Sequence, residues 1–71
     1  MNDWKKVYTD AIAELGGKRR AAINLGRSRQ TIYNVWAADQ ISAELVRDIA
    51  KLSQIPDLKH KLRPDLWEPG Q

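Results

Sequence analysis

The side chains of this chain that are most able to bind a ligand are five cations between Lys18 and Asn34. This stretch has no acidic residue, whereas the rest of the chain has seven basic and nine acidic residues. The net charge of +3 therefore comes from this one segment. Lys and Arg gathered in one segment are suited to neutralise the phosphates of a nucleic acid. The charge distribution predicts that residues 18–34 bind DNA.

A polar helix face is expected within the same segment. Ser28 is a suitable cap for a helix whose Ile32, Val35 and Trp36 point inward. The outer face then carries Arg29, Gln30, Tyr33 and Asn34. Arg pairs with guanine O6 and N7, and Gln or Asn pairs with adenine N6 and N7. We expect these four residues to contact bases.

Alternatives remain open for each of the four residues. Arg29, Gln30 and Asn34 are also able to bind phosphates. Tyr33 has three alternatives: its ring contacts a thymine methyl group, its hydroxyl binds a phosphate, or its ring is partly buried beside Trp36. Phosphate contacts are expected from the start of the preceding helix and from the turn, at Lys18, Arg19, Arg20, Arg27 and Ser28. Cations at a helix N-terminus oppose the helix dipole, which disfavours a purely structural role.

The apolar spacing and the Gly, Pro and Ser positions predict only helices, in a single domain spanning residues 1–71. A first helix at 4–15 has Asp3 as its cap and Gly16-Gly17 as its end. A short helix at 18–25 buries Ala22 and Leu25 with either Ala21 or Ile23, and Gly26 ends it. The third helix is followed by a loop at 37–41. The helices at 18–25 and from 29 on form a helix-turn-helix at about 18–37.

The second half is expected to contain two more helices. Ser42 caps one with Leu45, Ile49 and Leu52 on its apolar stripe, and this helix ends near Ser53. Pro56 starts a shorter one with Leu58 and Leu62, and Pro64 ends it before a C-terminal arm at about 64–71. The fold class is thus an all-α compact bundle of four to five short helices. Trp67 either folds back on the core or contacts a partner.

Four residues carry the helix-turn-helix pattern, each for a steric reason. Ala22 allows close helix approach, Gly26 accepts a left-handed turn, and Ile32 and Val35 hold the second helix on the first.

With this pattern the sequence resembles the Cro and repressor proteins of lambdoid phages and the related YdaS-like family of small bacterial and prophage regulators. The segments 22–36, 41–50 and, most distinctively, Leu62-Arg63-Pro64-Asp65-Leu66-Trp67 carry the resemblance. It implies a homodimeric repressor that binds a double-stranded, pseudo-palindromic operator and occludes a phage or prophage promoter. Its base contacts would come from Arg29, Gln30, Tyr33 and Asn34. Two residues depart from the family pattern: Arg27 replaces an apolar residue and Lys18 replaces a common Gln.

Other functional classes fit less well. The sequence has one His and no Cys, which is too few ligands for a metal site. It also lacks the combination of a nucleophile, a base and an orienting group that an enzyme needs. We expect no cofactor, no small-molecule effector and no membrane partner, and a location in the bacterial cytoplasm. The alternative is a YdaS-like antitoxin or protein-interaction module with an exposed C-terminal patch of Leu58, Leu62, Leu66 and Trp67.

Overall fold

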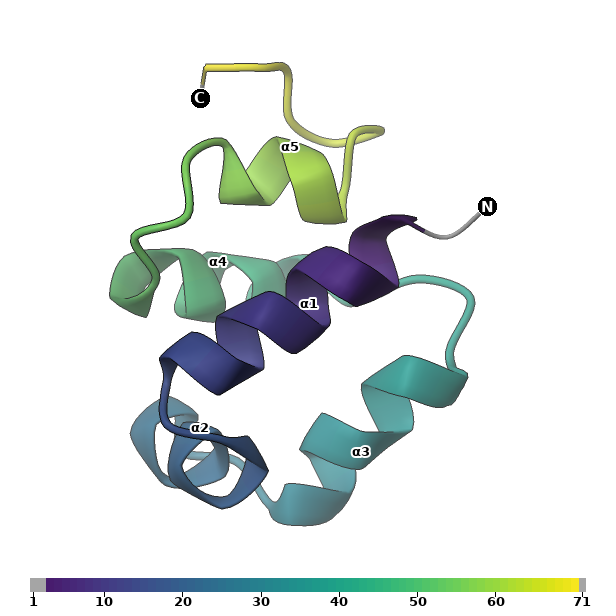
Figure 1. Cartoon of the computed structure of the whole chain (residues 1–71). Helices are drawn as coiled ribbons and strands as arrows, with labels where there is room; N and C mark the ends of the chain where they lie inside the picture. Colours follow the sequence, from purple (N-terminus) through teal and green to yellow (C-terminus); the bar gives the residue numbers. More distant parts are fainter. Residues whose placement is uncertain (1–2, 71) are drawn as a thin grey trace.

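The computed structural model describes residues 3–70, which form five helices and no strand (Figure 1). The helices are α1 (Asp3–Glu14), α2 (Lys18–Leu25), α3 (Arg29–Ala37), α4 (Ala43–Leu52) and α5 (Leu58–Leu62). This confirms the predicted all-α class. No helix in the described range is long and apolar enough to cross a membrane.

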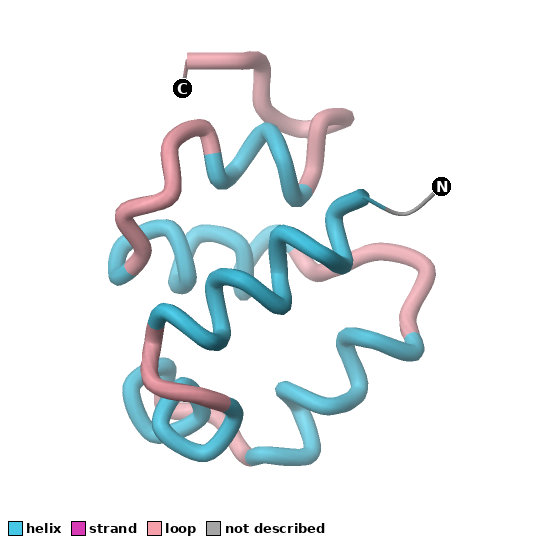
Figure 2. The backbone as a smooth tube through the Cα atoms, in the orientation of Figure 1, coloured by secondary structure: helices cyan, strands magenta, loops and turns pink. Residues whose placement is uncertain are grey.

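Helix α1 occupies the centre of the arrangement. It crosses the molecule with α4 and α5 on one side and α2 and α3 on the other, and only short loops connect the helices (Figure 2). α1 contacts both α2 and α5, while α2 packs on α3 and α4 packs on α5. The helix-turn-helix therefore forms one end of a molecule with extents of 29 × 23 × 18 Å.

A single apolar core joins the helices, and each of them contributes to it. Tyr8, Ile32 and Ile49 are among its completely buried side chains. The hydroxyl of Tyr8 donates a hydrogen bond to the carbonyl oxygen of Ile32 at 2.9 Å. The Tyr8 ring also meets the Trp36 ring edge to face, with ring centres 4.7 Å apart. Tyr8 thus fixes the position of α3 on α1.

The residues expected to begin and end the central helices do so. Ser28 accepts a hydrogen bond from the Thr31 amide, and Ser42 accepts one from the Leu45 amide, each at 3.2 Å. Gly26 has the left-handed conformation, with φ of 67°. Its amide donates to Ile23 O and that of Arg27 donates to Ala22 O, which together end α2.

The structure decides one alternative left open by the sequence, in α2, and corrects two expectations, for Leu52 and Pro56. Of the two alternatives in α2, Ala21 is buried and Ile23 is 70% exposed. Leu52 was expected on the apolar stripe of α4 but is 46% exposed, because it lies in the last turn of that helix. Pro56 does not start α5: the chain first turns through Asp57, which has a left-handed φ of 56°, and α5 begins at Leu58.

Replacing Tyr8 with Phe should lower stability, because the buried Ile32 carbonyl loses a hydrogen bond of about 1 kcal/mol. In a domain of this size, that change lowers the melting temperature by about 4–8 °C. Thermal unfolding followed by circular dichroism measures it. Tyr33→Phe is the matched control and should melt like the wild type, since Tyr33 is 48% exposed. Equal melting temperatures for all three proteins would contradict the role given to Tyr8.

Candidate nucleic-acid interface

The packing of α2 on α3 forms a helix-turn-helix. Ala22, Ile32 and Val35 are all buried, and α2 packs directly on α3. The chain passes from α2 to α3 through Gly26, Arg27 and Ser28. The four residues that carried the sequence pattern therefore have the positions and conformations predicted for them.

The outer face of α3 exposes the four residues expected to contact bases. Arg29, Gln30, Tyr33 and Asn34 are all exposed, and they lie opposite Ile32 and Val35. Gln30 Nε2 donates to Asn34 Oδ1 at 2.8 Å. This pairing leaves the Gln30 carbonyl oxygen and the Asn34 amide hydrogens free for an external partner. The face therefore offers a guanidinium, two oriented amides and a phenol.

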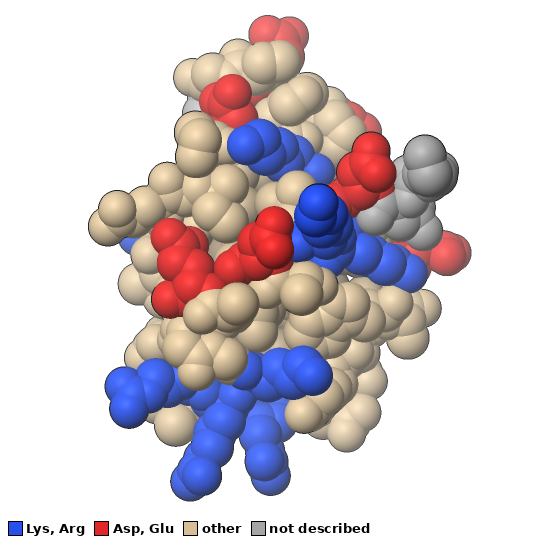
Figure 3. Space-filling model, in the orientation of Figure 1, with Lys and Arg blue, Asp and Glu red and all other residues tan. Residues whose placement is uncertain are grey.

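Positive charge surrounds this face. Lys18, Arg19, Arg20 and Arg29 are exposed, and none of them forms an ion pair with an acidic residue within 3–70. In Figure 3, Lys and Arg side chains gather at the end of the molecule where α2 and α3 lie, and no acidic side chain is visible there. Such a surface attracts a polyanion.

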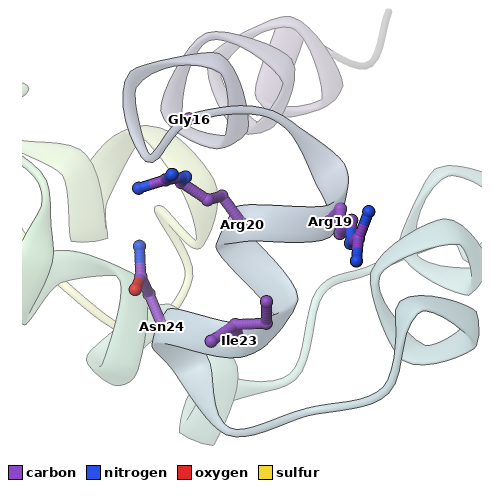
Figure 4. A pocket seen from close by; sticks show the side chains of 5 residues that line it. All are labelled: Gly16, Arg19, Arg20, Ile23 and Asn24. Carbon is purple, nitrogen blue, oxygen red and sulfur yellow. The ribbon is translucent and has the colours of Figure 1, made fainter.

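Arg19 and Arg20 leave α2 in opposite directions (Figure 4). The stem of Arg20 lies against Gly16, where a Cβ atom would approach Arg20 Cδ to 2.7 Å. An open hollow of about 440 Å³ is lined by Gly16, Arg19, Arg20, Ile23 and Asn24. Arg19 also borders this hollow, but its side chain leaves α2 in the direction opposite to that of Arg20. The two arginines therefore place their charges on different sides of α2.

Lys18 contacts aromatic rings. Its ammonium group lies 5.2 Å from the centre of the Tyr33 ring and 5.5 Å from that of Trp36. The two rings are themselves 6.3 Å apart. Of the alternatives left open by the sequence, the structure shows the packing beside Trp36, with 48% of Tyr33 still exposed. The contacts of Tyr33 with a thymine methyl group or a phosphate stay predictions.

Arg27 differs from the other cations of the segment because it has acidic partners within the chain. Its Nη2 donates to Asp48 Oδ2 at 2.6 Å and lies 3.8 Å from Glu44 Oε1. The Arg27 side chain is only 24% exposed. The structure thus places Arg27 between the turn and α4, apart from the exposed cations. Asp48 had no assigned role in the sequence, since only the fold reveals its distance from Arg27.

A sequence profile of one protein family, described as bacterial toxin YdaS, matches residues 9–70. The chain belongs to the YdaS family. The match includes α2 to α5 and the second half of α1. No curated protein and no solved structure matches the chain significantly. The resemblance to YdaS proteins is confirmed, and the resemblance to Cro proteins stays a prediction.

The C-terminal string of this YdaS-family chain has a structural role. Arg63 donates to Ile41 O at 2.7 Å and forms two hydrogen bonds with Asp65. These bonds hold the pKa of Asp65 below its usual value. The Trp67 carbonyl lies 2.9 Å from His60 Nδ1, and the Trp67 ring lies 5.7 Å from the Arg47 guanidinium. The predicted arm, which the structure describes as far as Gly70, folds back on the protein.

This arrangement removes most of the C-terminal patch that the protein-interaction alternative required. Leu58 and Leu62 are buried, and Trp67 is partly buried against the core. Only Leu66 of the four remains exposed, at 47%. Within residues 3–70 no group of three or more possible metal-ligating residues comes together. The cation-rich end of the molecule is therefore the stronger candidate for a functional surface.

The Arg27–Asp48 pair yields a prediction about stability. Arg27→Met and Asp48→Asn should each lower the free energy of unfolding by about 1–2 kcal/mol, a value between those of exposed and buried pairs. The double variant should lose clearly less than the sum, because both changes remove the same contact. Urea unfolding of the four proteins measures this coupling. Additive effects would mean that the contact contributes nothing, and an unaltered stability of Arg27→Met would favour the predicted phosphate contact instead.

Proposed function

We propose that this YdaS-family chain is a sequence-specific DNA-binding regulator that represses transcription by occupying an operator. The observation that carries the proposal is the exposed face of α3. This face carries Arg29 and Gln30 in the first turn after the Ser28 cap, and Tyr33 and Asn34 one turn later. Cations without acidic partners in the described chain flank this face. The combination suits an element that enters the major groove between two phosphate backbones.

The two helices have different roles in this proposal. α3 enters the major groove, where Arg29 and Gln30 in its first turn contact base edges. α2 crosses the backbone, so that Arg19 and Arg20 bind phosphates and contribute affinity for any sequence. Ser28 caps α3 through its hydroxyl, and in this proposal the same hydroxyl also donates to a phosphate. Repression then follows from occlusion of the promoter, without a small-molecule effector.

We further propose that two copies bind one operator. A single recognition helix contacts too few base pairs to select a site, and a symmetric pair doubles the sequence that is recognised. The half-sites of such an operator lie about 34 Å apart. The described chain supplies one α3 helix, so the second must come from another copy.

The family description favours a second candidate function, that of a toxin. In the present proposal any growth inhibition results from DNA binding. A variant without base contacts, such as Arg29→Ala with Gln30→Ala, then inhibits growth less than the wild type at equal expression. Equal inhibition by both proteins would favour a toxin that acts through another surface.

Selection from random duplexes tests the proposal directly. We expect a pseudo-palindromic site whose halves are separated by about one helical turn. Affinity for that site should fall steeply with salt, with a log–log slope of several units per dimer, because binding releases counterions from the phosphates. Recovery of no preferred sequence would contradict specific recognition, and one undivided half-site saturated by a single chain would contradict the dimer.

Arg29 and Arg19 should differ when each is replaced by Ala. Arg29→Ala should cost about 1–3 kcal/mol per half-site and relax the preference at one base pair. Arg19→Ala should weaken binding to all sequences alike and lower the salt slope by about one per chain. Both should melt like the wild type, since both side chains are exposed. Identical sequence preferences in the two variants would show that the roles of α2 and α3 are wrongly assigned.

A further inference from the structure

The outer face of α3 presents one large apolar group. Arg29, Gln30 and Asn34 are polar and are able to form hydrogen bonds with base edges, whereas the Tyr33 ring is 48% exposed and mostly apolar. The Tyr33 side chain lies one turn after Arg29 on the same side of the helix. Its ring therefore meets the same stretch of DNA as the polar residues in the proposed complex.

Contacts on the protein side hold this ring in place. The Lys18 ammonium lies over Tyr33 and Trp36 together, at 5.2 and 5.5 Å from the ring centres. Trp36 is fixed in turn, because its Nε1 donates to Thr9 Oγ1 at 2.9 Å and its ring meets that of Tyr8. A cation shared by an anchored ring and an exposed ring restricts the movement of the exposed one. The first residue of α2 thus orients a side chain of α3.

The chemistry of the major groove identifies a partner for an oriented apolar surface. The base edges in that groove present hydrogen-bond donors and acceptors, and their apolar group is the thymine 5-methyl. We infer that the Tyr33 ring contacts a thymine 5-methyl group in each operator half-site and that Lys18 is the positioning residue that holds the ring for this contact. This inference rests on the proposed DNA-binding function.

The assignment changes the role expected for Lys18. As a phosphate contact, Lys18 contributes to the salt slope and has no effect on the choice of base. As a positioning residue, it affects the preference for thymine through Tyr33. The two roles therefore differ in what they change, and a single pair of measurements separates them.

The experiment uses the duplex obtained by selection and replaces each thymine in turn by deoxyuridine, which removes only the methyl group. Fluorescence anisotropy with a labelled duplex gives the dissociation constants. For the wild type we expect about fourfold weaker binding at one position per half-site, the factor that corresponds to about 0.8 kcal/mol for one buried methyl group. Tyr33→Phe should keep this difference, and Tyr33→Ala should abolish it.

Lys18→Met should reduce the difference between the thymine and deoxyuridine duplexes to less than twofold, whereas Lys18→Arg, which keeps a cation over the rings, should retain most of it. Arg19→Met is the matched control, because it removes an adjacent exposed cation and should weaken both duplexes by the same factor. Thermal unfolding of every variant shows that the fold is retained.

Two results would overturn the inference while leaving the proposed function intact. If no deoxyuridine substitution weakened wild-type binding, Tyr33 would not contact a methyl group. If Lys18→Met kept the fourfold difference and lowered the salt slope by about one per chain, Lys18 would be a phosphate contact. Failure of the wild type to prefer any duplex would instead refute the proposed function itself, and with it this inference.

Discussion

The hydrogen bond from Tyr8 to the Ile32 carbonyl is the contact on which the exposed face of α3 depends. It joins the centre of α1 to the centre of α3 across the core. The Tyr8 hydroxyl is protonated at neutral pH like any phenol, and burial raises its pKa further, so it also remains a donor as the pH rises above neutral. Because the same ring supports Trp36, it also determines where the Lys18 and Tyr33 side chains meet. The surface proposed to bind DNA is thus positioned from the opposite side of α3.

Local signals were sufficient to predict most of the fold and the outer face of α3. Ser28 and Ser42 each precede an apolar helical stripe in the sequence, and each caps the helix that follows. Gly26 accepts the left-handed turn because it has no Cβ. Contacts between distant elements were not predictable in the same way. Ala21 and Ile23 fit the short α2 stripe equally well, and only the packing on α1 and α3 decides that Ala21 is buried. The start of α5 depends on the left-handed conformation of Asp57, which the sequence does not indicate.

The two residues that depart from the family pattern each take part in a contact between elements. Arg27 stands where an apolar residue would pack, and its guanidinium instead reaches Asp48 of α4, which lies 21 positions further along the sequence. Lys18 stands where Gln is common, and its ammonium lies over two rings of α3. Arg27 thus joins the turn of the helix-turn-helix to α4, and Lys18 joins α2 to α3. The Arg27 departure therefore alters a contact between the turn and α4, and the Lys18 departure adds a contact to Tyr33 on the outer face of α3.

The start of α2 shows how the chain tolerates a charge pattern that is unfavourable for folding. Three cations occupy its first turn, although no side chain caps this helix at Gly17. Each opposes the helix dipole at a cost of about 0.3–1 kcal/mol. The cation–π contact of Lys18 contributes about 0.5–1 kcal/mol and so offsets its own share. Arg19 and Arg20 have no ion-pair partner among residues 3–70, and their repulsion by the positive end of the helix dipole remains in the free protein. An anion at this helix start interacts favourably with the cations and with the free amide groups together, so the proposed phosphate contacts would relieve the repulsion that folding leaves in place.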